Sequence, residues 1–407
     1  MQQSTAGATA PLACLDREAI LAVLISLARD EREQAERRSL APAIWTAWRE
    51  ETPLDETGAG FDSVARLGLA TRFAEFFCLG EIGSDDYLTL ASDFGACVDV
   101  VAASLQRGAN AVTFRSSGTT GTPKRCRHEA ADLAFEAGQA SFLPGDGTVF
   151  GLVRPHHIYG FLFTVLGPCL AGRQVIHAEQ GPSAMRARNA RPGDLIVAAP
   201  GIWEMLLSGG AQFAGVHGTT AGGPATSAIW RLAKDAGLAS LEDIYGSTET
   251  GGLGRRSAPS APFRLMPTLR RHGEKIERRN TRRALATPPD EISWIDTTHF
   301  NLGPRRDGAV TVAGITVHPG EIAAQLACLS GVRSAAVRLS QSGDVRRLEA
   351  LIVPAQTGPT DALEACIRDA IAATLPAPAR PAAYSFANGL PRDANGKSDG
   401  WIEAPAT

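Results

Sequence analysis

The sequence predicts an α/β protein: a large N-terminal α/β domain that begins with a helical segment, followed by a small C-terminal α+β domain. Three observations support this. Hydrophobic residues recur at helical spacing through the N-terminal quarter, and short apolar strands then alternate with segments of helical length. After Gly303 the order changes to strand, helix, strand, strand and helix. The predicted parts are a helical segment at 1–105, an α/β core at 106–303 and the C-terminal domain at 304–407.

The composition is that of a folded protein without a dominant charge. Of 407 residues, 44% are hydrophobic and 20% charged, and the net charge is −3, so neither nucleic acid nor an anionic membrane is the expected partner. The longest uncharged apolar runs, 19–28 and 158–172, are too short to span a membrane, and no secretory leader is visible. Seven scattered cysteines without a Cys-x-x-Cys pair predict a reduced, cytoplasmic protein without structural zinc.

Each element follows from its local pattern. In the N-terminal segment, helices are expected at 19–28, 62–77 and 97–105. In the core, the expected strands are AVTF, TVFGLV, RQVIHA, DLIVAAP and EDIYG, with helices at 130–140 and 225–237, which is typical of a partly parallel sheet. In the C-terminal domain we expect strands AVTVAG, RSAAVRL and EALIVPA and helices PGEIAAQLACL and TDALEACIRDAIAATL, before a proline-rich tail.

A glycine-rich stretch, FRSSGTTGTPK at 114–124, predicts a phosphate-binding loop. It follows the strand AVTF, and its glycines let backbone N–H groups approach a polyphosphate closely. Its spacing is not that of a Walker loop. The alternative is an ordinary Gly/Ser/Thr turn, which the Pro-Lys pair disfavours. The residues expected to contact phosphate are Ser116, Ser117, Gly118, Thr119, Thr120, Gly121 and Lys124.

This stretch resembles the phosphate-loop signature of the adenylate-forming superfamily, which contains acyl-CoA synthetases, peptide-synthetase adenylation domains and luciferases. Further matches follow in the family's order. PHHIYG at 155–160 resembles the acid-pocket motif, and GGP at 222–224 resembles the glycine pair beneath the adenine and the acid. YGSTET at 245–250 and LPRDANGK at 390–397 are similar to two more family motifs. The resemblance covers about residues 110 to 397.

The resemblance implies a role for each motif. His157 belongs to the acid-pocket motif, although a lone histidine is more often structural. Glu249 is the expected Mg²⁺ ligand with Thr248 beside the phosphate or AMP, because Mg²⁺ prefers a few carboxylates together with phosphate oxygens. The residues implied to flank the adenine and the acid are Gly222, Gly223, Pro224, Tyr245 and Gly246.

Lys397 is the expected catalytic lysine. Adenylation brings a carboxylate to the α-phosphate of ATP, and a mobile positive charge offsets the repulsion between these two anions as the transition state forms. The alternative is an ordinary solvated lysine.

The hinge motif matches less closely. GPRRD resembles the family's Gly-Arg-x-x-Asp hinge, but Pro304 stands where the arginine is usual. Arg305 or Arg306 is then the substitute, and Asp307 is the expected hinge residue.

The family's ribose-binding aspartate has two candidates here. Direct spacing places His299 at that position, whereas Asp296 supplies a carboxylate if the loop shifts. We favour Asp296, because two ribose hydroxyls suit an acceptor with two oxygens.

Two regions suggest a carrier-protein partner. The segment at 54–67 resembles a carrier-protein helical bundle, with Ser63 at the pantetheine position, although the favoured alternative is that Asp62 and Ser63 cap a helix. Between Arg255 and Arg283 there are ten Lys/Arg against two Glu. This basic patch is interpreted as a dock for an acidic acyl carrier protein or for coenzyme A phosphates, the alternative being a solvated surface loop.

Together these motifs predict an AMP-forming acid–thiol ligase. It activates a carboxylic acid with ATP and Mg²⁺ to an acyl-adenylate and transfers the acyl group to coenzyme A or to carrier-protein phosphopantetheine. The resemblance implies rotation of the C-terminal domain between the two steps. The compact chain is similar to ligases of aryl-polyene or polyketide pathways, which implies a small aromatic or short-chain acid. Two alternatives stay open: a catalytically weak acyl-adenylate or nucleotide-binding module, and transfer to a non-thiol acceptor.

Overall fold

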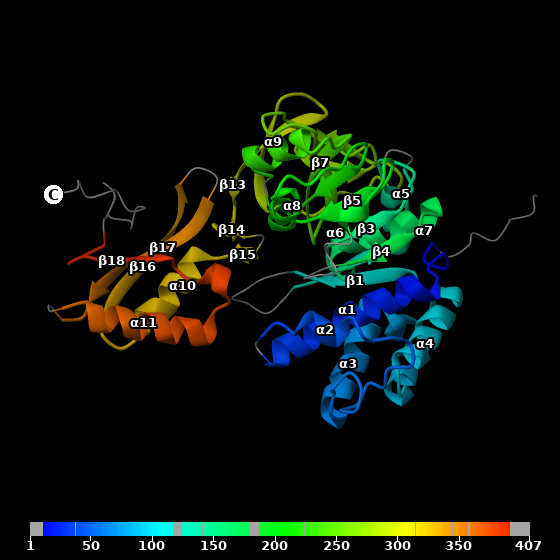
Figure 1. The fold of residues 1–407 in the computed structure, drawn as a ribbon, viewed down its shortest axis with the longest axis horizontal. Coiled ribbons are helices and arrows are strands. Elements are labelled where there is room, and N and C mark those ends of the chain that lie inside the picture. The colour runs from blue at the N-terminus through cyan, green and yellow to red at the C-terminus, as the bar shows by residue number, and fades with distance from the viewer. Residues whose placement is uncertain are drawn as a thin grey trace, which may run out of the picture.

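The elements of the protein form three groups in space. The computed structural model describes residues 11–36, 38–116, 124–139, 142–178, 187–223, 225–313, 315–342, 345–356 and 359–390. Figure 1 shows the N-terminal helices below a central sheet-rich body, with the C-terminal elements gathered to one side. This mixed α/β architecture with a smaller C-terminal α+β group confirms the predicted fold class.

Three long helices form the N-terminal group, as the sequence predicts. They are α1 (Arg17–Glu36), α3 (Ser63–Phe76) and α4 (Phe94–Gln106), with short α2 (Pro42–Trp45), η1 (Leu79–Ile82) and η2 (Asp85–Leu90) between them. Helix α1 packs against α3 and α4. Asp62 begins α3, because its Oδ1 accepts hydrogen bonds from the N–H groups of Val64 and Ala65 at 3.0 and 2.8 Å. Ser63 is the exposed first residue of that helix.

The central body is built on a nine-stranded mixed sheet. Its strands, in spatial order, are β12 (Asp290–Trp294), β13 (His299–Arg305), β9 (Phe263–Leu265), β8 (Gly251–Arg256), β7 (Ser240–Ser247), β6 (His217–Thr220), β5 (Leu195–Ala198), β3 (Val149–Gly151) and β4 (Val175–His177). From β4 to β7 the neighbours are parallel, which confirms the predicted parallel part. From β7 to β12 they are antiparallel. Strand β7 therefore lies at the boundary between the two halves.

Helices and two hairpins complete the body. The helices are α5 (Ala130–Ala137), α6 (Ile158–Phe161), η3 (Leu162–Leu166), α7 (Gly167–Ala171), α8 (Pro200–Leu207) and α9 (Ser227–Asp235). The hairpins are β1 (Ala111–Arg115) with β2 (Arg125–Glu129), and β10 (Leu269–His272) with β11 (Lys275–Arg278). The apolar run at 158–172 forms α6, η3 and α7 in succession.

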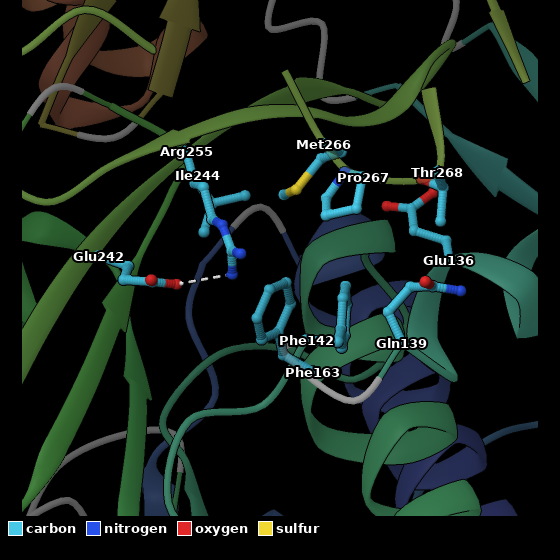
Figure 2. Close-up of a pocket in the computed structure, with 10 residues that line it drawn as sticks. All are labelled: Glu136, Gln139, Phe142, Phe163, Glu242, Ile244, Arg255, Met266, Pro267 and Thr268. Atoms are coloured by element: carbon cyan, nitrogen blue, oxygen red, sulfur yellow. Dashed lines mark ion pairs between the residues drawn. The ribbon is translucent and has the colours of Figure 1, made fainter. Parts of the chain in front are cut away.

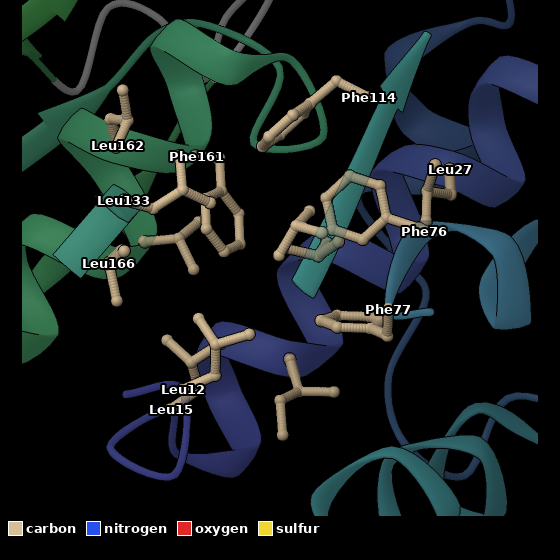
Figure 3. Close-up of a cluster of buried hydrophobic side chains, with 14 of the residues drawn as sticks. Leu12, Leu15, Leu27, Phe76, Phe77, Phe114, Leu133, Phe161, Leu162 and Leu166 are labelled. Atoms are coloured by element: carbon tan, nitrogen blue, oxygen red, sulfur yellow. The ribbon is translucent and has the colours of Figure 1, made fainter. Parts of the chain in front are cut away.

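Aromatic side chains join the N-terminal helices to the body. Phe76 of α3 contacts Phe114 of β1 and Phe161 of α6 edge-on, with ring centroids 5.5 and 5.8 Å apart. Phe114 and Phe161 contact each other at 5.6 Å. Figure 3 shows these rings together with leucines from α1, α5 and η3. One hydrophobic core therefore supports the N-terminal helices, the strand before the phosphate loop and the acid-pocket motif.

The C-terminal elements have a core of their own. They are β14 (Val310–Val312), β15 (Ile315–Val317), α10 (Pro319–Ala327), β16 (Val332–Ser342), β17 (Val345–Pro354), α11 (Asp361–Thr374), η5 (Ala377–Ala379) and β18 (Ala383–Phe386). Ile322 and Leu326 of α10 and Ile367 and Ile371 of α11 are buried in it. Strand β18, in the segment expected to be a proline-rich tail, pairs parallel to β17.

Candidate active site

The predicted phosphate loop is the tip of the β1–β2 hairpin. The Ser116 N–H donates to the Lys124 carbonyl at 2.9 Å, and the Lys124 N–H donates to Ser116 Oγ at 3.0 Å. These two bonds close the neck of the loop. The other expected phosphate contacts, at 117–121, lie outside the described residues.

A buried histidine joins this hairpin to the YGSTET motif, which forms the end of β7 and the turn into β8. Burial lowers the pKa of His128 on β2, and its Nε2–H donates to the Thr248 carbonyl at 2.7 Å. Within the turn, the Ser247 N–H donates to Thr250 Oγ1 at 3.1 Å. The expected metal ligand, Glu249, has neither an ion pair nor a hydrogen bond among the described residues, so its carboxylate is available to a cation.

The charges of Glu249 and Lys124 both act on the thiol of Cys126. Burial raises the pKa of the Cys126 thiol, the negative charge of Glu249 raises it further, and the positive charge of Lys124 lowers it. The structure therefore brings Glu249, Thr248, Ser116 and Lys124 into one region, as the resemblance implies.

A buried ionic cluster fixes the turn after Glu249 to helix α5. Glu136 Oε1 accepts the Gly252 N–H at 2.9 Å, and Glu136 Oε2 lies 3.5 Å from Arg278 Nη1. Arg278 Nε lies 3.3 Å from Asp132 Oδ2, and its Nη2 donates to the Thr250 carbonyl at 3.5 Å. Burial raises the pKa of Glu136, an effect that the Arg278 charge opposes. All three charged side chains are buried, so the cluster resists displacement of the turn.

Tyr245, implied to flank the adenine, donates its hydroxyl hydrogen to Asp290 Oδ2 at 2.8 Å. Asp290 begins β12 and pairs across the strands with Arg305 of β13. Arg305 forms a two-pronged ion pair with the expected hinge residue Asp307, at 2.9 and 2.6 Å. This pair lowers the pKa of Asp307 to about 2. The residues of the adenine motif and of the hinge are thus neighbours.

Asp296, the favoured ribose ligand, is occupied by its own turn. Its Oδ1 accepts the N–H groups of Thr298 and His299 at 2.6 and 2.7 Å, and its Oδ2 lies 2.8 Å from His299 Nδ1. These bonds hold the pKa of Asp296 well below its usual range. Both ribose candidates from the sequence therefore bond mainly to each other, while Asp290 is the carboxylate beside Tyr245.

The acid-pocket motif is anchored to the N-terminal helix α1. His156 Nδ1 lies 2.8 Å from Ser26 Oγ, and Arg154 forms an ion pair with Asp30 at 2.8 Å. His157 stands at the N-terminus of α6 with its ring 4.4 Å from that of His156. Burial lowers the pKa of both histidines, that of His157 to about 4. Both rings are therefore neutral at pH 7.

Gly222 and Gly223 follow β6 at the same sheet edge where β7 ends, which is where ligands bind in α/β sheets. Gly222 has a φ of +84°, a conformation that favours glycine, and the space where a Cβ would stand is open. Pro224, between β6 and α9, and the expected catalytic Lys397 lie outside the described residues.

A narrow cavity of about 10 Å³ lies between β7, α5 and η3, with room for about one water (Figure 2). Phe142 and Phe163 stack on one side with ring centroids 4.3 Å apart. Thr268 is 2% exposed, and its Oγ1 has no hydrogen-bond partner among the described residues. The lining also includes Glu136, Gln139, Glu242, Ile244, Arg255, Met266 and Pro267. The cavity combines an apolar, aromatic wall with one unsatisfied hydroxyl.

The basic patch is partly neutralised by acidic neighbours. At least five of its ten basic side chains form ion pairs, namely Arg255, Arg256, Arg270, Arg271 and Arg278, with Glu242, Asp243, Glu277, Glu274 and the Asp132–Glu136 pair in that order. Exposed Arg264, Lys275, Arg282 and Arg283 have no ion pair within the described part of the chain. The free positive charge is therefore smaller than the sequence count.

The sequence did not identify three residues that contact the YGSTET motif, namely His128, Asp290 and Arg278. Their contacts with the motifs cross 120, 45 and 28 residues of chain, so no local pattern could reveal them. Over the described ranges no cluster of three or more His, Cys, Asp or Glu side chains could hold a metal. No helix that the structure describes is both long and apolar enough to cross a bilayer.

Comparison with known proteins identifies relatives along nearly the whole chain. A family model described as AMP-binding enzyme matches residues 21–317. A 4-coumarate–CoA ligase from Rhodobacter capsulatus is 38% identical over 392 residues, covering 93% of this chain and 99% of the relative. A protein of the same name from Cereibacter sphaeroides is 36% identical, covering 95% and 97%. The solved structure of o-succinylbenzoate CoA synthetase from Bacillus subtilis superimposes with a TM-score of 0.56 at 17% identity, covering 70% of this chain and 67% of that one.

Proposed function

The chain belongs to the AMP-binding enzyme family, and from that premise we propose that its site converts a carboxylic acid to an acyl-adenylate with ATP and passes the acyl group to the thiol of coenzyme A. It is an AMP-forming acid–thiol ligase. The observation that carries this proposal is the bond from His128 to Thr248. It connects the phosphate-loop hairpin to the turn that carries Glu249, so that a nucleotide and its metal ion would meet.

The residues present fit a Mg²⁺ ion bound together with ATP. Glu249 offers one carboxylate without a competing partner in the described chain, and Mg²⁺ takes its remaining ligands from phosphate oxygens and water. Bound there, the ion offsets negative charge on the phosphates. Glu249 would hold it, while the loop between Ser116 and Lys124 would contact the β- and γ-phosphates.

We propose a small aromatic acid as the substrate. The relatives from Rhodobacter capsulatus and Cereibacter sphaeroides carry the name 4-coumarate–CoA ligase, and the cavity wall of Phe142, Phe163 and Met266 suits a flat ring. The space of about 10 Å³ is smaller than any aromatic ring, so this wall must open to admit the acid. A short-chain acid remains the alternative, and the acid panel below separates the two.

Between adenylation and transfer to the thiol in the proposed reaction, the C-terminal elements rotate about Asp307. Lys397 would first offset the repulsion between the acid and the α-phosphate, and would then withdraw to admit the thiol. Asp307 lies in the short connection between β13 and β14, where its Oδ1 also accepts the Ala309 N–H at 3.0 Å. Backbone rotation at this connection would move the whole C-terminal group.

A carrier-protein phosphopantetheine is a second candidate acceptor. The exposed cations Arg264, Lys275, Arg282 and Arg283 are the part of the basic patch that could meet an acidic carrier or the phosphates of coenzyme A. The rate of acyl transfer to coenzyme A and to a carrier protein, each measured at 50 and 300 mM salt, tests this use of the patch. A steep loss at high salt for one acceptor alone assigns the patch to that acceptor.

The decisive experiment for the proposed function is pyrophosphate release from ATP and Mg²⁺ across aromatic, short-chain and medium-chain acids. We expect release with a few aromatic acids, loss in Lys397→Ala and no change in the matched surface variant Lys234→Ala. Acyl–coenzyme A should then form on addition of the thiol. ATP binding without release for every acid would favour a nucleotide-binding module instead, and release without thioester would indicate a non-thiol acceptor.

A further inference from the structure

Two cysteines separated by 155 residues meet at the surface of the molecule. Cys169 near the end of α7 donates its Sγ–H to the Cys14 carbonyl at 2.6 Å, and the Cys14 thiol is directed to the Pro11 carbonyl at 3.5 Å. Cys169 Sγ therefore lies against the backbone of Cys14, and the two thiols also interact with each other electrostatically. Both are free thiols, Cys14 exposed and Cys169 half-buried.

Their surroundings give the two thiols different chemistry. The side-chain interaction between the two thiols lowers the pKa of Cys14 and raises the pKa of Cys169. The thiolate is the form that attacks a disulfide. Cys14, exposed and more readily ionised, is therefore suited to react first, with Cys169 in position to react second.

The other cysteines lack such a pairing in the described structure. Cys78 and Cys97 are buried, and burial raises the pKa of each, that of Cys97 to about 12. Cys328 and Cys366 are exposed on the C-terminal elements, and no other thiol is recorded in contact with either among the described residues. They serve as internal controls for unselective oxidation.

We propose that Cys14 and Cys169 form a reversible intramolecular disulfide when the protein meets a disulfide oxidant such as oxidised glutathione. The Cys14 thiolate attacks one sulfur of oxidised glutathione and releases one glutathione thiolate. The Cys169 thiolate then attacks the Cys14 sulfur of the mixed disulfide and releases the second. The two cysteine protons end on two reduced glutathione molecules, so two thiols are oxidised and one disulfide is reduced.

The disulfide would fasten the first described residues to the body of the enzyme. Leu12 and Leu15, on either side of Cys14, are buried in the cluster that contains Leu166 of η3 (Figure 3). Helix α7 continues directly from η3, so the bond would tie the segment before α1 to the helices behind the cavity. It closes a long loop of chain, which is the arrangement in which a cross-link restricts the unfolded state most.

The test treats the reduced full-length protein with oxidised glutathione, blocks free thiols, and maps peptides by mass spectrometry without reduction. We expect a peptide pair joined through Cys14 and Cys169, reversed by dithiothreitol and retained in the control variant Cys366→Ser. In Cys169→Ser, Cys14 should instead keep one bound glutathione. In Cys14→Ser, Cys169 should stay unmodified.

Thermal unfolding supplies the second measurement. We expect the oxidised wild type to unfold at a Tm at least about 2 °C above the reduced form, and Cys14→Ser to show no such difference. Glutathione retained on Cys14 of the wild type without a cross-link, or cross-links that favour Cys328 or Cys366, would overturn the proposal. A Cys14–Cys169 disulfide without a rise in Tm would overturn the proposal that the bond stabilises the attachment of the segment before α1 to the body.

Discussion

The hydroxyl of Tyr245 and the carboxylate of Asp290 lie 2.8 Å apart, although 45 residues of chain separate them. The contact joins the motif implied to flank the adenine to the first residue of β12, which pairs with Arg305 of the hinge strand. This bond uses Oδ2 of Asp290, and no hydrogen bond to its Oδ1 is recorded in the described part of the chain. We therefore propose Asp290, rather than Asp296, as the carboxylate that meets the ribose beside Tyr245.

Asp290→Asn should raise the KM for ATP about tenfold, since it weakens one charged hydrogen bond to the nucleotide. Asp296→Asn should leave the KM unchanged and lower the Tm, because Asp296 stabilises its own turn. Steady-state pyrophosphate release at varied ATP, with a thermal melt of each variant, measures both. The opposite pattern would return the ribose role to Asp296.

His128→Ala should reduce kcat/KM for adenylation about tenfold, because the Thr248 carbonyl loses its donor and the Glu249 turn is no longer held against the phosphate-loop hairpin. The matched control is His272→Ala, which removes an exposed histidine. Equal rates in the two variants would show that the His128 bond does not position the site.

Glu249→Gln should raise the Mg²⁺ concentration needed for half-maximal pyrophosphate release by about tenfold or more, since the variant removes the charge that attracts the ion. Glu274→Gln, at an exposed carboxylate in the basic patch, is the control. An unchanged Mg²⁺ requirement in Glu249→Gln would remove Glu249 from the metal site.

Arg278→Met should lower the free energy of unfolding by about 3 to 5 kcal/mol, because Asp132 and Glu136 stay buried without their cation. Urea unfolding measures the loss, with Arg282→Met as the exposed control. Adding Glu136→Gln to Arg278→Met should recover part of it, since one unpaired charge is then absent. No recovery would mean that Arg278 acts through packing alone.

The stability of the protein should fall as the pH drops from about 6.5 to 4. His156 and His157 are held neutral by burial, with pKa values lowered from 6.5 in the folded chain, that of His157 to about 4. In this window the unfolded state binds more protons at these residues, so acid favours unfolding. Urea unfolding at several pH values should show a smaller slope in the double variant His156→Gln, His157→Gln. An unchanged slope would assign the acid sensitivity to other groups.

The sequence could predict the elements and motifs that are formed by neighbouring residues, but few of the contacts between segments far apart in the chain. The helices at 19–28 and 62–77 and the parallel strands carry clear spacing patterns, and the phosphate loop is recognisable from residues that adjoin one another. The antiparallel strands β8 (GGLGRR), β9 (FRL) and β13 (HFNLGPR) lack such runs, because glycine, arginine or proline interrupts their apolar residues. Strand β18 was hidden by the prolines before it, and only its pairing with β17 defines it.

The same limit applies to the site. Thr248 and Glu249 were recognisable as a motif, but the residues that fix their position, His128 and Arg278, could be found only from three-dimensional contacts. The sequence favours Asp296 over His299 because a carboxylate suits a ribose, and no local pattern reveals that the oxygens of Asp296 bond to its own turn.

The contacts from helix α1 to the acid-pocket motif matter for anyone who fuses this enzyme to another protein. Ser26 reaches His156 across 130 residues of chain, and Asp30 holds Arg154. A tag or partner domain joined ahead of α1 is therefore attached to the helix that holds the PHHIYG motif in place. Such fusions need a flexible linker of Gly and Ser before residue 11, and a change in acid preference after fusion would report strain in α1.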